Sequence, residues 1–262
     1  GPVITRLALT SSKSATLPID FHNCLLSSII SMDDTMSIKQ LPLTLIVAAT
    51  PKHGIGKDGA LPWPMLKKEM AYFARVTKRV PMPTGTGSVQ SDAWKQANLE
   101  GTRRNVVIMG RKTWDSIPVK FRPLKDRTNI VISTQDRAKL GDPPDTVLVA
   151  GDIMAGLEQL EQCVRDGHAL PVGRTFVIGG SSIYRAAMDL PQANSVLLTR
   201  IHRDYECDTL FPEDLDDVRT GWQRQSQDEL QAFVGEEMPA QPIVDGSHGD
   251  EVSFEYRLYQ RP

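Results

Sequence analysis

The chain has 262 residues, 40% of them hydrophobic, so it is long enough to bury one large core. Its 30 basic and 32 acidic residues give a formal charge of -2, which excludes a global field favouring nucleic acid or an anionic membrane. No apolar run approaches the roughly 20 residues that a membrane-spanning helix requires, so we expect a cytoplasmic protein with no membrane or nucleic-acid partner.

Residues 1–40 are predicted to be a flexible extension outside the fold. Gly1-Pro2 is typical of a protease scar, and the Ser- and Thr-rich stretch up to about Asp34 has no sustained period. The basic residues Arg6 and Lys13 are a weak sign of a mitochondrial targeting peptide. The nearby aspartates argue against such a peptide. We therefore assign residues 41–262 to a single domain.

Short apolar runs predict strands from Leu41 onward, with helical patterns between them: 43–49, 105–109, 129–133, 146–150, 174–178 and 195–201. Such alternation predicts an α/β fold with a mixed, mostly parallel sheet and helices on both faces. Apolar and polar residues alternate from Phe254 to Tyr259, which predicts an antiparallel last strand.

Three helices are predicted between the strands. Pro64 suits the first turn of the first helix, whose apolar stripe comprises Leu66, Met70, Phe73 and Thr77. Asp152 can cap the second, and Ser181 with Ser182 can open the third. Two further stretches, 78–104 and 213–250, are interpreted as surface insertions, and Gly85-Thr-Gly87 as a plain loop.

Glu69 is the most informative residue because helical spacing places its carboxylate on the apolar face. One interpretation is a solvated charge at the edge of the stripe. The other is a carboxylate at the bottom of a pocket, which accepts two parallel hydrogen bonds from a flat heterocycle such as a pterin. Two segments precede Glu69: the loop Gly54-Ile-Gly56-Lys-Asp-Gly59 and the run Leu61-Pro-Trp63-Pro64. They could close over a ligand, or they could form only a tight connection between strand and helix.

Two segments are candidate phosphate sites. Gly110-Arg-Lys-Thr113 joins a strand to a helix, where backbone N-H groups and two cations converge, although it could be a solvated basic turn. Ile178-Gly-Gly-Ser-Ser-Ile-Tyr184 also runs from strand to helix, and its glycines permit close approach of a pyrophosphate. Arg127 could pair with a substrate carboxylate or lie on the surface.

Metal and covalent catalysis are not indicated. The five histidines and Cys24, Cys163 and Cys207 lack metal-ligand spacing, and the odd cysteine count suits free thiols in a reducing compartment.

Together these motifs resemble dihydrofolate reductases of the chromosomal, eukaryotic and fungal-like type. The resemblance runs from about Leu43 to Tyr259 and rests on Ile46-Val-Ala48, the two segments before Glu69, Tyr72-Phe73, Val107-Ile-Met-Gly-Arg-Lys-Thr-Trp114, Arg122-Pro-Leu124, Ile178–Tyr184, Thr199-Arg-Ile201 and Asp208-Thr-Leu-Phe-Pro212. It implies NADPH-dependent reduction of 7,8-dihydrofolate, binding of antifolate inhibitors, and a monomer.

The resemblance also implies residue roles. Glu69 anchors the pterin, Thr199 bonds its carboxylate from behind, Leu61 and Trp63 border the site of hydride transfer, and Arg127 binds the glutamate carboxylate of the substrate. The remaining folate cleft is lined by Ile46, Val47, Met70, Phe73, Ile117, Leu124 and Ile178. NADPH is held by Ala48, Ile55, Gly56, Gly110, Arg111, Lys112, Thr113, Ser133, Thr134, Gly179, Gly180, Ser181, Ser182, Ile183 and Tyr184.

The resemblance further implies a cis peptide bond between Gly179 and Gly180. Two positions depart from the family pattern. Met70 replaces an aromatic or other bulky residue, and Thr134 replaces a frequent cation, so the preference for the 2'-phosphate depends on Arg111 and Lys112.

Two other functions would use part of the same motifs. A pyrimidine reductase of riboflavin synthesis would share the nicotinamide site, but Leu61-Pro-Trp-Pro64 together with Glu69 disfavours it. A silent folate-binding or messenger-RNA-binding protein would keep the pocket without turnover. Candidates at every catalytic position, and the lack of a basic aromatic stripe, argue against that.

Overall fold

The computed structural model describes residues 37–81 and 103–262. The predicted extension up to residue 36, Cys24, and the loop Gly85-Thr-Gly87 lie outside these residues. Within the described part of the chain, no helix is long and apolar enough to cross a membrane.

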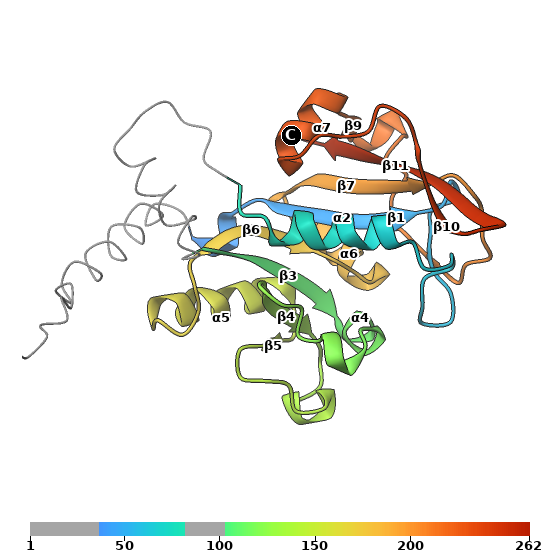
Figure 1. Ribbon diagram of the computed structural model, residues 1–262. Coiled ribbons are helices and arrows are strands. Elements are labelled where there is room, and N and C mark those ends of the chain that lie inside the picture. The colour runs from blue at the N-terminus through green and yellow to red at the C-terminus, as the bar shows by residue number, and fades with distance from the viewer. Residues whose placement is uncertain (1–36, 82–102) are drawn as a thin grey trace, which may run out of the picture.

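Eleven strands and five α-helices are described between these limits (Figure 1). The strands are β1 (Leu43–Ala49), β2 (Gly54–Gly56), β3 (Arg104–Gly110), β4 (Thr128–Ile132), β5 (Leu148–Ala150), β6 (Val172–Val177), β7 (Ala193–Ile201), β8 (Thr209–Leu210), β9 (Gln223–Arg224), β10 (Ile243–Ser247) and β11 (Asp250–Gln260). The helices are α2 (Lys67–Lys78), α4 (Arg111–Ser116), α5 (Ile153–Arg165), α6 (Ser181–Met188) and α7 (Gln227–Val234). Short 3-10 helices cover Ile38–Gln40, Val119–Phe121, Arg137–Leu140 and Val218–Thr220.

The main sheet is mixed, in the order β10-β11-β7-β1-β6-β3-β4-β5, with β9 paired to β11. The pairs from β7 across to β5 are parallel, whereas β11 is antiparallel to both β7 and β10. This arrangement confirms the predicted fold class and the antiparallel last strand. A small second sheet pairs β2 with β8.

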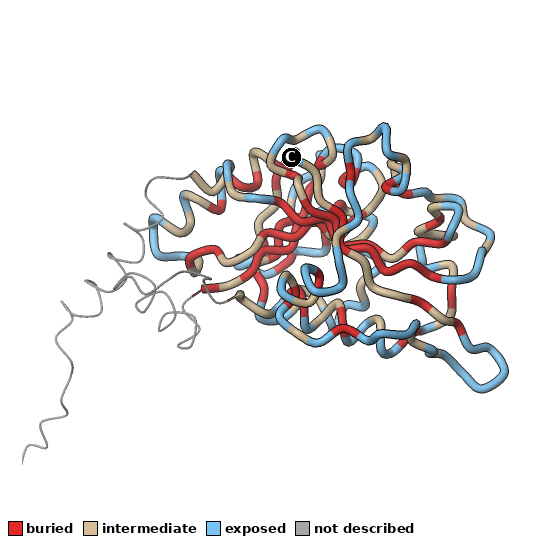
Figure 2. The backbone as a smooth tube through the Cα atoms, turned by 90° about the horizontal axis from the view of Figure 1, so that it is seen from above, coloured by how far each residue is buried: buried red, intermediate tan, exposed pale blue. Residues whose placement is uncertain are grey.

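Helices cover both faces of the sheet, and buried residues follow its central strands (Figure 2). On one face, Tyr72 and Val76 of α2 and Leu230 of α7 pack against Ile46 and Phe176. On the other, buried residues of α5 and α6 pack against alternate strand residues such as Leu45, Val106 and Ile130. Near-continuous burial along the strands follows from this double cover.

The predicted start of the first helix is wrong. Pro64 and Met65 precede the helix, Leu66 has extended backbone angles, and α2 begins at Lys67. The predicted apolar stripe is also narrower than expected, because Leu66 and Thr77 are buried but Met70 is 51% exposed. Asp152 does cap α5 by accepting a hydrogen bond from the Ala155 amide, as predicted.

Residues 213–250, predicted as a surface insertion, lie largely at the surface, but they include α7 and two strands of the main sheet. Leu215, Trp222, Leu230, Val234 and Met238 are buried, because α7 and its flanking segments cover the sheet beside β11. The end of the predicted N-terminal extension is packed as well, since the Ser37 hydroxyl donates a hydrogen bond to Glu161 of α5 at 3.0 Å.

Asn105 links the end of α2 to two strands and is fully buried. Its side-chain amide donates to the carbonyl oxygens of Thr77 and Arg79 at 3.0 and 2.8 Å, and its oxygen accepts from the Arg174 amide at 2.7 Å. These contacts satisfy carbonyl groups left open at the helix terminus.

We therefore expect Asn105→Ala to lower the free energy of unfolding by about 2–3 kcal/mol, because it leaves buried backbone groups unpaired. Urea unfolding followed by circular dichroism measures the difference, with exposed Gln223→Ala as the control. A loss equal to that of the control would contradict the proposed role of Asn105.

Candidate active site

The predicted site residues gather at the carboxyl ends of the parallel strands. Ile46 and Ala48 lie in the second half of β1, Gly110 ends β3, Ile178 follows β6, and Thr199 lies late in β7. The chain runs from β1 outward to β3, β4 and β5, then returns to place β6 and β7 on either side of β1. Ligands of open α/β sheets bind at such a reversal of strand order.

Glu69 of α2 and Thr199 of β7 meet in this region. The Thr199 hydroxyl donates a hydrogen bond to Oε1 of Glu69 at 2.9 Å, as predicted. Burial raises the pKa of the Glu69 carboxyl, the Thr199 hydrogen bond opposes that shift, and the negative charge of Asp245 adds to it. The site therefore holds a carboxylate with few partners, which a ligand with N-H donors can stabilise.

Apolar side chains surround the pair. Ile46 is buried, and Phe73, Ile117, Leu124 and Ile178 are partly buried against the same hydrophobic cluster, so five predicted substrate residues lie together. Trp63 is buried in an adjoining cluster that also includes Ala48. Such a lining suits a flat heterocycle with one polar edge.

The remaining predicted substrate residues lie at the rim or elsewhere. Met70 and Leu61 are 51% and 56% exposed. Arg127 is buried, and its guanidinium donates to the Lys125 carbonyl and to the Thr77 hydroxyl at 2.9 and 3.0 Å. The Val47 side chain packs in the cluster on the opposite face of the sheet, so only its backbone could reach a ligand on the Glu69 side.

The two candidate phosphate segments lie side by side. The Gly110 amide donates to the Gly179 carbonyl at 2.8 Å, and the Gly179-Gly180 peptide bond is cis, as predicted. Helices α4 and α6 start directly after Gly110 and Gly180, and neither has a side-chain cap. A β-carbon at Gly110 would lie 2.8 Å from Cγ1 of Ile183, so only glycine permits this approach.

The predicted cofactor residues differ in how far they are exposed. Lys112 is exposed, whereas the Arg111 guanidinium donates to the Lys139 carbonyl at 2.7 Å and lies 3.4 Å from Asp115. Tyr184 is buried, and its hydroxyl donates to the Ile46 carbonyl at 2.7 Å. The other predicted cofactor residues are Ile55, Gly56, Thr113, Ser133, Ser181 and Ile183, which are buried or partly buried, and Thr134 and Ser182, which are exposed.

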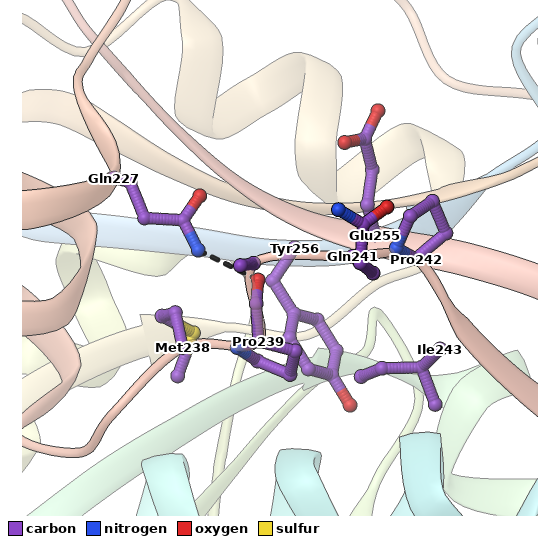
Figure 3. Close-up of a pocket in the computed structure, with 9 residues that line it drawn as sticks. Gln227, Met238, Pro239, Gln241, Pro242, Ile243, Glu255 and Tyr256 are labelled. Atoms are coloured by element: carbon purple, nitrogen blue, oxygen red, sulfur yellow. Dashed lines mark hydrogen bonds between the residues drawn. The ribbon is translucent and has the colours of Figure 1, made fainter.

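Sequence reasoning missed Tyr256 and Asn129. The Tyr256 ring stacks on that of Tyr72 with centroids 3.7 Å apart, and Tyr256 also lines a small hollow beside β11 (Figure 3). Asn129 fixes Leu124 by bonding both its amide and its carbonyl at 2.9 Å. The alternation of the last strand could have identified Tyr256, but nothing local marks Asn129.

Neither metal ligation nor a disulfide is found in residues 37–81 and 103–262. No group of three or more potential metal ligands occurs among them, and Cys163 and Cys207 are free. The chemistry of the site thus depends on a partly buried carboxylate, an apolar lining and two helix starts.

Comparisons with known proteins agree with this geometry. A model of the dihydrofolate reductase family matches residues 95–240. The chain is 36% identical to a dihydrofolate reductase of Pneumocystis carinii over 85% of this chain and 98% of that protein. It is 42% identical to one of Rattus norvegicus over 66% and 79%.

A solved structure of Schistosoma mansoni dihydrofolate reductase matches with a TM-score of 0.60 and 27% identity, over 85% of this chain and 99% of that one. The relatives are thus matched over most of their length, with the same fold. The chain belongs to the dihydrofolate reductase family.

Proposed function

We propose that this chain reduces 7,8-dihydrofolate to 5,6,7,8-tetrahydrofolate with NADPH, and that Glu69 binds the pterin. The observation that carries the proposal is the partly buried Glu69 carboxylate, held by the Thr199 hydroxyl at the reversal of strand order. Family membership supports the overall reaction, and the placement of the side chains supports the individual roles.

Glu69 would accept two parallel hydrogen bonds from adjacent N-H donors of the pterin, in a charge-assisted fork. Thr199 holds one carboxylate oxygen, which restricts the rotation of the group before the ligand arrives. Ile46, Phe73 and Trp63 exclude water around the ring. Positioning of this kind supplies much of the rate of a bimolecular transfer.

The residues at the phosphate segments fit NADPH. Two uncapped helix starts and the glycines at 110 and 180 provide backbone N-H groups for a pyrophosphate, and Lys112 with Arg111 provides cations for the 2'-phosphate. When bound, the nicotinamide supplies hydride from C4 to C6 of dihydrofolate. Because the edge held by Glu69 lies away from N5, we expect an ordered water to deliver the proton to N5.

The finer assignments complete the proposal. Arg127 would bind the glutamate carboxylate of the substrate, with its guanidinium oriented by Thr77 and the Lys125 carbonyl. Leu61 and Met70 would contact the ligand at the rim of the cleft. We further propose a monomeric, cytoplasmic enzyme that binds antifolates, with one catalytic domain after residue 40.

Loss of 340 nm absorbance on mixing NADPH and dihydrofolate tests the function directly. We expect methotrexate-sensitive turnover that favours NADPH over NADH. Glu69→Gln should lower kcat about 100-fold or more at neutral pH. The neutral amide has a single acceptor oxygen and cannot form the charged pair of hydrogen bonds with the pterin.

The matched control is Glu237→Gln, which neutralises an exposed carboxylate and should not change the rate. Unchanged turnover in Glu69→Gln would refute the role of the carboxylate. Tight folate binding by the wild-type protein without NADPH oxidation would instead favour the silent binding protein.

The raised pKa of Glu69 also predicts how stability depends on pH. Between the ordinary value of 4.5 and the higher folded value, the folded protein binds more protons than the unfolded chain. The free energy of unfolding of the ligand-free wild type therefore falls as pH rises through this interval. In Glu69→Gln this fall in the free energy of unfolding should be absent, because the amide does not titrate.

We accordingly expect Glu69→Gln to be more stable than wild type at pH 8, with the difference vanishing as pH falls below the ordinary carboxyl pKa of 4.5. Urea unfolding at several pH values measures the trend, again with Glu237→Gln as the control. A difference that does not vary with pH would contradict the raised pKa.

A further inference from the structure

The first turn of α2 is held by the C-terminal hairpin. Leu66 at the N-cap position has no side chain able to cap the helix. Instead, Oδ2 of Asp245 in β10 accepts a hydrogen bond from the Lys68 amide at 2.7 Å. Oδ1 of Asp245 accepts from the Gly246 amide at 2.9 Å, so both carboxylate oxygens are fixed.

A second contact reinforces this link. The Lys68 ammonium group donates to the Val244 carbonyl at 2.9 Å, so residue 68 is bound to β10 through both its backbone and its side chain. Glu69 is the next residue of the helix. The position of the Glu69 backbone thus depends on a distant strand, since Lys68 and Asp245 are 177 residues apart in the chain.

The same hairpin also supports the other partner of Glu69. Strand β10 pairs with β11 and β11 with β7, and in that register Tyr256 lies opposite Thr199. Figure 3 shows Tyr256 and Glu255 projecting to opposite sides of β11, with Tyr256 on the side of α2, where it stacks on Tyr72. The antiparallel edge of the sheet therefore orients the Glu69 backbone through Asp245 and its carboxylate through Thr199.

We propose that Asp245 is a positioning residue for the reduction, which fixes the first turn of α2 and places a negative charge beside Glu69. The inference rests on the proposed role of Glu69. In this proposal Asp245 contacts neither the pterin nor the cofactor. It acts on Glu69 through the first turn of α2.

The charge of Asp245 has a separate consequence. The groups coupled electrostatically to Glu69 are Asp245 of β10, Tyr72 of α2, Tyr184 of α6 and Tyr256 of β11, and Thr199 of β7 donates to it. The burial-raised pKas of the three tyrosines keep them neutral at physiological pH. Asp245 is thus the anion of this set, and its charge raises the pKa of Glu69 further.

Two substitutions separate position from charge. Asp245→Asn keeps an oxygen that can accept from the Lys68 amide but removes the charge, whereas Asp245→Ala removes both. For Asp245→Ala we expect the KM for dihydrofolate to rise about tenfold and kcat to fall, with the KM for NADPH within about twofold of wild type.

For Asp245→Asn we expect a KM for dihydrofolate within about threefold of wild type at neutral pH. Folate binding should weaken as acid protonates Glu69, and without the neighbouring anion the midpoint of this loss should move to lower pH. Tryptophan fluorescence titrations of folate across pH measure it. Asp250→Asn, in the same hairpin and paired with Arg203, is the matched control and should behave as wild type.

Equal effects of Asp245→Asn and Asp250→Asn on the midpoint, together with an unchanged KM in Asp245→Ala, would overturn the inference. If the alanine variant does not fold, the pH midpoint of Asp245→Asn alone decides: a shift toward acid supports the inference and no shift overturns it. A wild-type protein that does not reduce dihydrofolate would refute the proposed function instead, which the 340 nm assay reports separately.

Discussion

The structure depends on one unfavourable placement: the partly buried Glu69 carboxylate, which accepts a hydrogen bond from the Thr199 hydroxyl. Thr199 donates a hydrogen bond to Glu69, and the nearby Tyr72, Tyr256 and Asp245 interact with it electrostatically. An uncompensated buried charge is costly, so the free protein keeps a site that a ligand with N-H donors relieves. In the proposed function, this one carboxylate contributes both binding free energy and orientation of the substrate.

The fold supplies that placement through its topology. The strand order reverses around β1, and α2 packs on one face of the sheet with Glu69 in its first turn (Figure 1). The antiparallel strands β10 and β11 extend the sheet beyond β7 and hold α2 from outside. The starts of α4 and α6 adjoin each other, and we propose that the dinucleotide binds there.

Much of this arrangement could be predicted from sequence. Buried parallel strands are read directly as apolar runs, and β1 was predicted with the observed bounds. The Glu69 and Thr199 pair and the cis bond at Gly179-Gly180 followed from a family resemblance and were confirmed. The roles assigned to individual ligand-binding residues stay predictions.

The errors arose where distant segments decide local structure. Pro64 suits a helix start, yet α2 begins at Lys67, where Asp245 from another part of the chain binds the Lys68 amide. The segment 213–250 is acidic, rich in turn residues and largely exposed, but five spaced apolar side chains within it are buried. Nothing in the local sequence relates Asp245 to Glu69, because the Asp245 contact with α2 joins residues 177 apart in the chain. The most direct test is infrared difference spectroscopy of the Glu69 carboxyl across pH, with Glu69→Gln to assign the band. The raised pKa predicts a protonated band that persists above pH 4.5 in the free protein and disappears when folate binds, whereas titration at the ordinary value in both states would contradict it.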